Sequence, residues 1–311
     1  MSTIKIGVHA NNPALFLLSH LDLAQRALAP LGVEVEWHRY TGGTETGRKL
    51  VDGVIDVGGT GATPPIVDQA NGLPVVYLAH SDPRPAHGTL LVAPGSDVAS
   101  VADLRGRRVA LGIGSWQTLL LAVALDRAGV AFDEVEAVES GPDSLEQLQA
   151  GELGAWIGQG PQHVRAVESG AAVELVPASD LIANPSLWYT RRDVAERRGA
   201  ELGAIAGALE DAGLWAAAHP GAAAELFAEH EGGAPEAWEA FVRRIPWTVN
   251  PIGAAFVAEQ QAGADVLARV GFLPRPVTIA EATVAELASY VEAGLEAARE
   301  ARGTEAAAPV R

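Results

Sequence analysis

The chain of 311 residues has no cysteine, only one methionine, and no apolar run near the ~18 consecutive residues that span a bilayer. Without cysteine it can form no disulfide, no thiolate metal site and no thiol nucleophile. It also lacks the lipid-bearing cysteine of many bacterial surface lipoproteins. The absence leaves the compartment open, because a cysteine-free chain is stable in either redox state.

Positive charge is scarce. Lys and Arg number 22 against 39 Asp and Glu, which gives a formal net charge of −17. Such a chain repels phosphate backbones and anionic membranes, so we expect no nucleic-acid partner and no direct membrane insertion. A few local donors can still bind a small anion against this overall field.

The sequence also lacks the common catalytic signatures. It has no HExxH pair, no Gly-x-Ser-x-Gly elbow, and neither the Gly spacing of a Rossmann loop nor the GK[ST] of a P-loop. We therefore expect no metal, no cofactor and no catalytic residues.

The N-terminus starts almost at once with a predicted strand, Ile4 to Val8, and no charged region with a following apolar run precedes it. We expect a periplasmic or extracellular protein if a signal segment was removed upstream. If Met1 is the native start, we expect a cytoplasmic one.

Predicted strands and helices alternate along the chain and then give way to a helical tail after Asp193. This alternation predicts an α/β fold of two lobes, each a mostly parallel sheet flanked by helices, with a ligand cleft between them. We assign residues 1–92 and 190–311 to the first lobe and 93–189 to the second. The two crossings form a hinge. We expect residues 302–311 to be a disordered tail and the protein to be a monomer.

Several ordered stretches resemble one family. The resemblance covers about residues 4–285 and lies in Leu28 to Val33, Asp52 to Gly58 with Gly61 to Pro65, Ser100 to Ala110 with Gly114-Ser115, Asp211 to Ala216, Asn250 to Ile252, and Glu259 to Gln261. These resemble the substrate-binding proteins of ABC uptake systems for aliphatic sulfonates, taurine and nitrate, with the sulfonate branch the best match. The resemblance implies a periplasmic-binding-protein-like fold of type II, a small anionic organic ligand such as a sulfonate, and a membrane permease as partner.

An alternative function stays open. The same family includes 2′-hydroxybiphenyl-2-sulfinate desulfinase, which cleaves a carbon–sulfur bond with a cysteine in the loop after its first strand. That loop here holds Asn11 and Asn12, so thiol-based desulfination is excluded. A cytoplasmic, cofactor-free C–S lyase or hydrolase-like enzyme on the same scaffold is the alternative to solute capture.

Two Gly-rich loops lead from a strand into a helix and are the first candidates for anion binding. They contain Gly61, Ala62 and Thr63 in the first lobe and Gly114, Ser115 and Trp116 in the second. Helix N-termini attract anions through unpaired N–H groups. The alternative is that both loops are tight turns with a capping hydroxyl.

Other candidates follow strands at the expected cleft edge. The ligand-binding candidates are His9, Asn11, Asn12, His80, Ser81, Gln159 and Trp188. The alternatives are loop-forming polar residues and, for Trp188, a tryptophan of the interlobe core. Secondary candidates are Arg84 and His87 as rim charges or hinge residues, and Trp247 and Asn250 in the tail.

Overall fold

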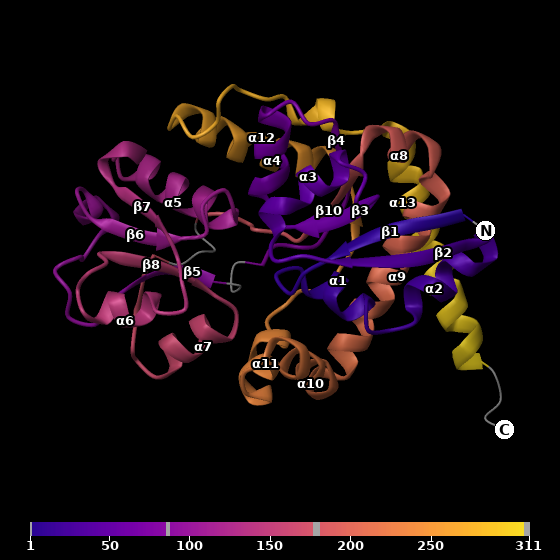
Figure 1. The fold of residues 1–311 in the computed structure, drawn as a ribbon, viewed down its shortest axis with the longest axis horizontal. Coiled ribbons are helices and arrows are strands. Elements are labelled where there is room, and N and C mark those ends of the chain that lie inside the picture. Colours follow the sequence, from indigo (N-terminus) through magenta and orange to yellow (C-terminus); the bar gives the residue numbers. More distant parts are fainter. Residues whose placement is uncertain (1, 85–87, 177–180, 308–311) are drawn as a thin grey trace.

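The first of two sheets is built from both ends of the chain. In the computed structural model, which describes residues 2–84, 88–176 and 181–307, its strand order is β11-β4-β10-β3-β1-β2. Its strands are β1 (Ser2–Val8), β2 (Val33–Arg39), β3 (Val57–Thr60), β4 (Val75–His80), β10 (Leu187–Arg191) and β11 (Asn250–Pro251). Strands β1 to β4 run in one direction, and β10 lies antiparallel between β3 and β4. Figure 1 shows this sheet surrounded by most of the helices.

The second sheet uses only the middle of the chain, in the order β7-β6-β8-β5-β9. Its strands are β5 (Gly88–Val92), β6 (Arg108–Leu111), β7 (Glu136–Glu139), β8 (Ala155–Gln159) and β9 (Val173–Val176). β5 is antiparallel to both of its neighbours, β8 and β9. The first strand after each crossing, β5 or β10, therefore runs antiparallel to both of its neighbours in the sheet that it enters.

This arrangement moves the crossings from their predicted positions. Residues 88–92 lie in the second sheet as β5, and residues 187–189 lie in the first sheet as part of β10. The crossings fall between β4 and β5 and between β9 and β10, a few residues earlier than predicted. The physical reason is that a strand arriving from the other lobe starts at the end of the new sheet where most of its strands finish. It therefore runs antiparallel to those strands and pairs with them, and not with the sheet that the chain has left.

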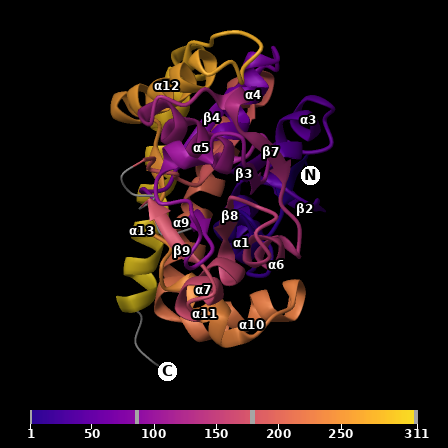
Figure 2. The same cartoon turned by 90° about the vertical axis from the view of Figure 1, so that its left-hand side faces the viewer.

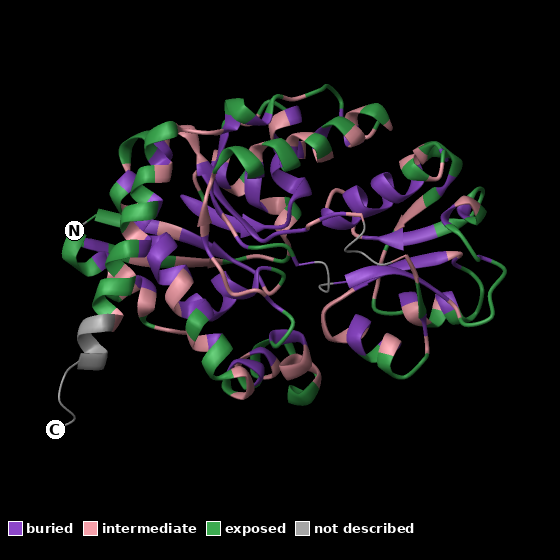
Figure 3. Ribbon diagram, turned by 180° about the vertical axis from the view of Figure 1, so that it is seen from behind, coloured by how far each residue is buried: buried purple, intermediate pink, exposed green. Residues whose placement is uncertain are grey.

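Helices cover both sheets. The helices with the bounds that the structure gives them are α1 (Pro13–Leu18), α2 (Leu23–Leu28), α3 (Thr46–Val51), α4 (Thr63–Ala70), α5 (Trp116–Arg127), α6 (Ser144–Gln149), α7 (Gly160–Glu168), α8 (Arg192–Arg197), α9 (Gly199–Ala218), α10 (Pro220–Glu231), α11 (Pro235–Val242), α12 (Ala254–Arg269) and α13 (Ala285–Ala307). The strands are mostly buried, whereas the outer helix faces are exposed (Figure 3). Among the described residues, no helix combines the length and the apolar character needed to cross a membrane.

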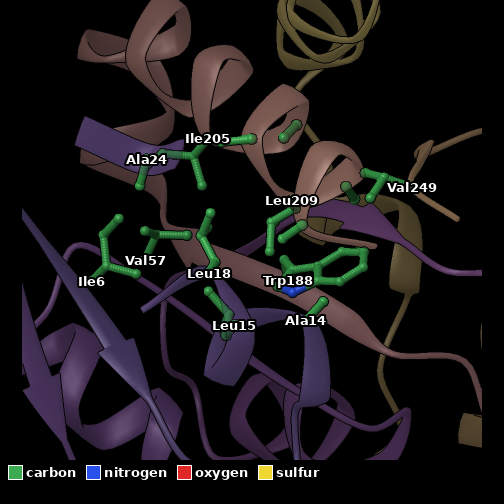
Figure 4. Close-up of a cluster of buried hydrophobic side chains, with 14 of the residues drawn as sticks. Ile6, Ala14, Leu15, Leu18, Ala24, Val57, Trp188, Ile205, Leu209 and Val249 are labelled. Carbon is green, nitrogen blue, oxygen red and sulfur yellow. The ribbon is translucent and has the colours of Figure 1, made fainter. Parts of the chain in front are cut away.

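The core of the first lobe lies between the sheet and helices α1, α2 and α9. Figure 4 shows Ile6 and Val57 from the sheet facing Leu18 and Ile205 from the helices, with Trp188 of β10 beside them. Burial of such side chains contributes roughly 1.5–3 kcal/mol each. This cluster fixes where the loops at the ends of β1 and β3 emerge.

The helical tail contacts both lobes. Helix α11 packs against α7 and helix α12 against α5, so two tail helices flank the second lobe, as Figure 2 also shows. At each contact an arginine of the tail forms an ion pair with a carboxylate of the second lobe: Arg244 pairs with Glu168 at 3.1 Å, and Arg269 with Asp126 at 2.7 Å.

The C-terminal end departs from the prediction of a disordered tail at residues 302–311. Helix α13 continues to Ala307, and its Arg302 pairs with Glu210 at 3.0 Å and with Asp211. These two carboxylates of α9 hold the last turns of α13 against the lobe. Residues 308–311 lie outside the described residues.

Helices α9 and α13 approach so closely that only glycine fits between them. A Cβ on Gly294 would overlap the carbonyl oxygen of Gly203, which is backbone and cannot rotate away. We expect Gly294→Ala to lower the free energy of unfolding by about 1–3 kcal/mol, because the helices must separate. Urea unfolding followed by circular dichroism measures it. The control is Gly221→Ala in α10, where the nearest atom to a new Cβ is 3.9 Å away. Equal stability of both variants would contradict the close packing.

Candidate functional site

A polar cleft of about 430 Å³ lies where the two sheets face each other. Loops that follow β1, β2 and β3 form its wall in the first lobe, and loops that follow β6, β7 and β8 form its wall in the second. The carboxyl ends of strands are the usual place for ligands in α/β proteins, because loops there can vary without disturbing the sheet.

Four hydrogen bonds join the two crossing segments at the base of this cleft. The N–H of Ser81 donates to the carbonyl of Ser186 at 2.9 Å, and the N–H of Ser186 donates to Ser81 Oγ at 2.8 Å. Arg84 adds two more: its N–H donates to the carbonyl of Ala183 at 2.7 Å, and its Nε donates to the carbonyl of Asn184 at 3.1 Å. The two crossing segments, the predicted hinge, are therefore paired by a short ladder of backbone and side-chain hydrogen bonds that fixes Arg84 in position.

Arg84 lines the cleft, and no carboxylate among the described residues pairs with its charge. Its side chain is 2% exposed, no ion pair to it occurs within the described part of the chain, and its Nη1 atom makes no hydrogen bond. Burial lowers the pKa of this guanidinium to about 9, so it is still protonated at neutral pH. A buried cation without a counter-ion is costly. The cleft is thus electrostatically suited to an anion.

His9 lies on the same wall and is held as a neutral ring. Its Nε2 donates to the carbonyl of Gly59 at 2.8 Å, while its Nδ1 is buried and makes no hydrogen bond. Burial lowers the pKa of the imidazole, although the carbonyl of Gly59 and the nearby Glu45 oppose this. In the neutral ring Nδ1 is an acceptor, which could receive a hydrogen bond from a bound molecule.

The opposite wall is formed by the loop from β6 into α5. Ser115 caps the helix by accepting a hydrogen bond from the N–H of Gln117 at 3.2 Å. Gly114 has φ +80°, a conformation that side-chain-bearing residues rarely adopt, so the tight turn into the helix depends on glycine. The turn directs Ser115 and Trp116 toward the first lobe.

Two hydrogen bonds form a chain across the cleft. Trp116 Nε1 donates to Gln159 Oε1 at 3.0 Å, and Gln159 Nε2 donates to Asn11 Oδ1 of the other lobe at 3.3 Å. A Cβ on Gly61 would approach Trp116 Cβ at 3.2 Å, so the lobes also touch there.

The structure brings together about half of the residues predicted for the site. His9, Asn11, Gly61, Ser115, Trp116 and Gln159 line the cleft, and so does the secondary candidate Arg84. Those that do not line it are Asn12, Ala62, Thr63, His80, Ser81, Gly114 and Trp188. The secondary candidates Trp247 and Asn250 also lie elsewhere, and His87 lies outside the described residues.

Two of the candidates that do not line the cleft form a hydrogen bond with each other. Trp188 is 1% exposed in the first lobe's core, and its Nε1 donates to Asn12 Oδ1 at 3.2 Å. The same Asn12 oxygen accepts the N–H of Leu15 at 3.3 Å and so caps α1. Both side chains are used in holding the loop after β1, so they turn away from the cleft.

The others are used in the hinge, in turns or in helix packing. His80 stacks on Phe256, and Ser81 belongs to the hinge ladder. The carbonyl of Ala62 accepts a hydrogen bond from Gln260 at 2.6 Å, and Thr63 is fully buried in the first turn of α4. Gly114 supplies the turn conformation, while its neighbours Ile113 and Ser115 reach the cleft.

Sequence reasoning missed two loops that line the cleft. One is Gly42, Gly43 and Thr44 after β2, and the other is Glu139, Ser140, Gly141 and Pro142 after β7. Each loop follows a strand that the sequence predicts, and this position after a strand was the signal that could have identified it. Thr60 and Gln117, which belong to the two predicted Gly-rich loops, also line the cleft. Other lining residues that were not predicted are Gly112, Ile113, Trp156, Ile157 and Gln162.

A larger groove of about 950 Å³ lies between α2, α9 and α13. It is lined mainly by alanine, leucine and glycine, and Arg302 at its edge is paired with acidic residues of α9. It lies away from the strand ends. The smaller cleft is therefore the better candidate, because it holds the unpaired buried charge.

A buried carboxyl, that of Asp68, lies in α4. Tyr189 donates its hydroxyl hydrogen to Asp68 Oδ2 at 3.0 Å. Burial raises the pKa of Asp68 to about 7, although the hydrogen bond from Tyr189 acts in the opposite direction. Within the described residues, no group of three or more His, Cys, Asp or Glu side chains is placed to hold a metal.

Comparison with known proteins identifies relatives over most of the chain. A family model described as "NMT1/THI5 like" matches residues 29–223. A protein of Escherichia coli (strain K12) named as an aliphatic sulfonates-binding protein is 31% identical over 248 residues, 79% of this chain and 78% of its own length.

Two solved structures share the fold. The periplasmic aliphatic sulphonate binding protein SsuA from Escherichia coli has a TM-score of 0.82 at 27% identity, over 90% of this chain and 91% of its own. The alkanesulfonate-binding protein SsuA from Xanthomonas axonopodis pv. citri, bound to MOPS, has a TM-score of 0.81 at 25% identity, over 91% and 98%. The predicted two-lobed fold class is confirmed.

The raised pKa of Asp68 predicts a pH dependence of stability. Between about pH 4 and pH 7 the folded state binds a proton that the unfolded state has released, so the free energy of unfolding falls as pH rises through this window. We expect Asp68→Asn to remove the contribution of this carboxyl to the pH dependence of the free energy of unfolding, which is up to about 1.4 kcal/mol per pH unit. Urea unfolding at pH 4.5 and pH 8 measures it. The exposed Asp133→Asn variant should keep the wild-type slope. A wild-type slope in Asp68→Asn would be evidence against the buried neutral carboxyl.

Proposed function

Because this chain belongs to the NMT1/THI5-like family, we propose that it captures a small organic sulfonate in the interlobe cleft and delivers it to a membrane permease of an ABC uptake system. The observation that carries the proposal is Arg84, a buried guanidinium that lines the cleft and that pairs with no carboxylate in the described part of the chain. A sulfonate is a strong-acid anion, and its oxygens can accept charge-assisted hydrogen bonds from the two terminal nitrogens of an arginine.

The comparisons support the same ligand class. Relatives named for binding aliphatic sulfonates or alkanesulfonates cover most of this chain in sequence and in fold. The overall charge of −17 does not oppose the proposal, since the field inside the cleft is set by the nearest groups. Among these, Arg84 carries the positive charge.

Neutral polar groups complete the recognition that we propose. Thr44 of the first lobe offers a hydroxyl, and Gln159 and Asn11 offer amides from opposite lobes. The helix α5 starts at the cleft wall, with its positive dipole end toward the ligand space. A ligand that contacts both walls favours the closed arrangement, which is the form of a solute-binding protein that a permease can recognise.

The test is the affinity of variants at position 84. We expect Arg84→Gln to bind propanesulfonate at least about 100-fold more weakly, because about 3 kcal/mol of charge-assisted hydrogen bonding is lost. Arg84→Lys should fall between the two, since it keeps the charge and loses the two-pronged geometry. Isothermal titration calorimetry measures these affinities.

Two controls separate binding from folding. Arg48→Gln removes an exposed arginine of α3 and should bind as the wild type does. Without ligand, Arg84→Gln should be at least as stable as the wild type, because an unpaired buried charge is removed. Wild-type affinity in a folded Arg84→Gln protein would refute the role of this residue. If wild-type protein binds no sulfonate, the ligand class is wrong.

A further inference from the structure

We infer that Asn184 is a positioning residue for the cleft, because its left-handed backbone turns two consecutive carbonyl groups onto Arg84 and so fixes how the guanidinium meets a ligand. This inference rests on the proposed function and specifies how its site is held. It starts from the φ of Asn184, which is 46°. In the part of the chain that the structure describes, no other residue except glycine has a positive φ.

The backbone conformation of Asn184 is unfavourable for two reasons. A positive φ brings the Cβ of an L-residue close to the following carbonyl, although asparagine tolerates this better than most residues. In addition, Pro185 follows, and a residue before proline is usually restricted to an extended conformation with negative φ. Such strained residues persist only where the surrounding structure holds them, and they are concentrated at ligand sites and switch regions.

The two carbonyl groups on either side of this strained residue both bond to Arg84. The carbonyl of Ala183 accepts the N–H of Arg84 at 2.7 Å, and the carbonyl of Asn184 accepts its Nε–H at 3.1 Å. In an extended strand, consecutive carbonyls point to opposite sides of the chain and bond to different partners. The left-handed step at Asn184 lies between these two peptide groups and turns both toward one arginine.

This pairing determines which atoms of Arg84 remain for a ligand. Its Nε is occupied by the carbonyl of Asn184, while its Nη1 makes no hydrogen bond. A guanidinium that is already oriented loses little conformational freedom on binding, and this favours affinity. The backbone of Asn184 therefore contributes to binding through Arg84 and not by touching the ligand.

The side chain of Asn184 lies behind the cleft wall. Asn184 is 3% exposed and does not line the cleft. A Cβ built on Gly61, which does line it, would lie 3.5 Å from Asn184 Oδ1, and this oxygen makes no hydrogen bond. Because the amide oxygen has no partner, we assign the role of Asn184 to its backbone.

Packing alone does not hold the strained segment. A second cavity, of about 230 Å³, is lined by residues 181–185 together with residues of α5 and α12. A segment that borders a cavity is constrained by fewer neighbouring atoms than one in a close-packed interior. The bonds to Arg84 therefore carry much of the constraint on Asn184, and the two residues position each other.

The experiment measures the affinity for propanesulfonate by calorimetry on full-length variants at position 184. We expect Asn184→Val to bind at least about tenfold more weakly, because a β-branched residue relaxes to negative φ and turns its carbonyl away from Arg84 Nε. Asn184→Ala, which opposes a positive φ less strongly, should show a smaller loss. Asn184→Gly should stay within about twofold of the wild type, since glycine adopts positive φ freely.

A second pair of variants tests whether the effect passes through the guanidinium. Lysine has no Nε–H for the carbonyl of Asn184 to hold. In an Arg84→Lys protein, adding Asn184→Val should therefore weaken binding by less than about twofold, so the two losses should not add. The matched control is Asn71→Val, the same change at an exposed asparagine with φ −83° at the end of α4, which should bind as the wild type does.

Three results would overturn the inference while sulfonate binding stands. They are wild-type affinity in folded Asn184→Val and Asn184→Ala proteins, equal weakening by valine and by glycine, and a full tenfold loss on adding Asn184→Val to Arg84→Lys. If the wild-type protein binds no propanesulfonate, the proposed function fails and this inference fails with it.

Discussion

The site depends on the short ladder of hydrogen bonds between the two crossing segments. Ser81 pairs with Ser186, and Arg84 pairs through its N–H and Nε with the carbonyls of Ala183 and Asn184. These bonds join the two crossing segments side by side and hold the Arg84 side chain where it lines the cleft. With Nε occupied by a backbone carbonyl, Nη1 is left without a partner in a buried setting. The fold thus maintains an uncompensated charge, which a ligand can neutralise.

The remaining polar groups of the cleft are held in place by partners within the protein. Gln159 is fixed between Trp116 and Asn11, His9 is fixed by the carbonyl of Gly59, and Ser115 caps α5. Groups that are already oriented lose little conformational freedom when a ligand binds, which favours affinity. Arg84 differs from them, because no carboxylate among the described residues neutralises its charge.

The sequence predicted the elements and the cleft edge well, because alternating strands and helices place strand ends on one side of each sheet. It predicted the loops after β1, β3, β6 and β8, and six of the residues named there line the cleft. It did not predict strand order, which depends on long-range pairing, so the loops after β2 and β7 and their Glu139 were missed. The sequence also could not show which residues of one loop face the cleft: Gly61 lines it, while Thr63, two positions later, is fully buried. Asn12 and Trp188, which were also predicted there, hydrogen-bond to each other inside the core and do not line the cleft.

The most direct measurement is sulfur anomalous diffraction from a crystal of the protein with propanesulfonate. The chain has one methionine and no cysteine, so the protein itself contributes a single sulfur atom, that of Met1. We predict a second anomalous peak in the cleft, with a sulfonate oxygen about 2.7–2.9 Å from Arg84 Nη1, as in charge-assisted hydrogen bonds. A ligand peak in the groove between α2, α9 and α13, or one in the cleft out of reach of Arg84, would contradict the account.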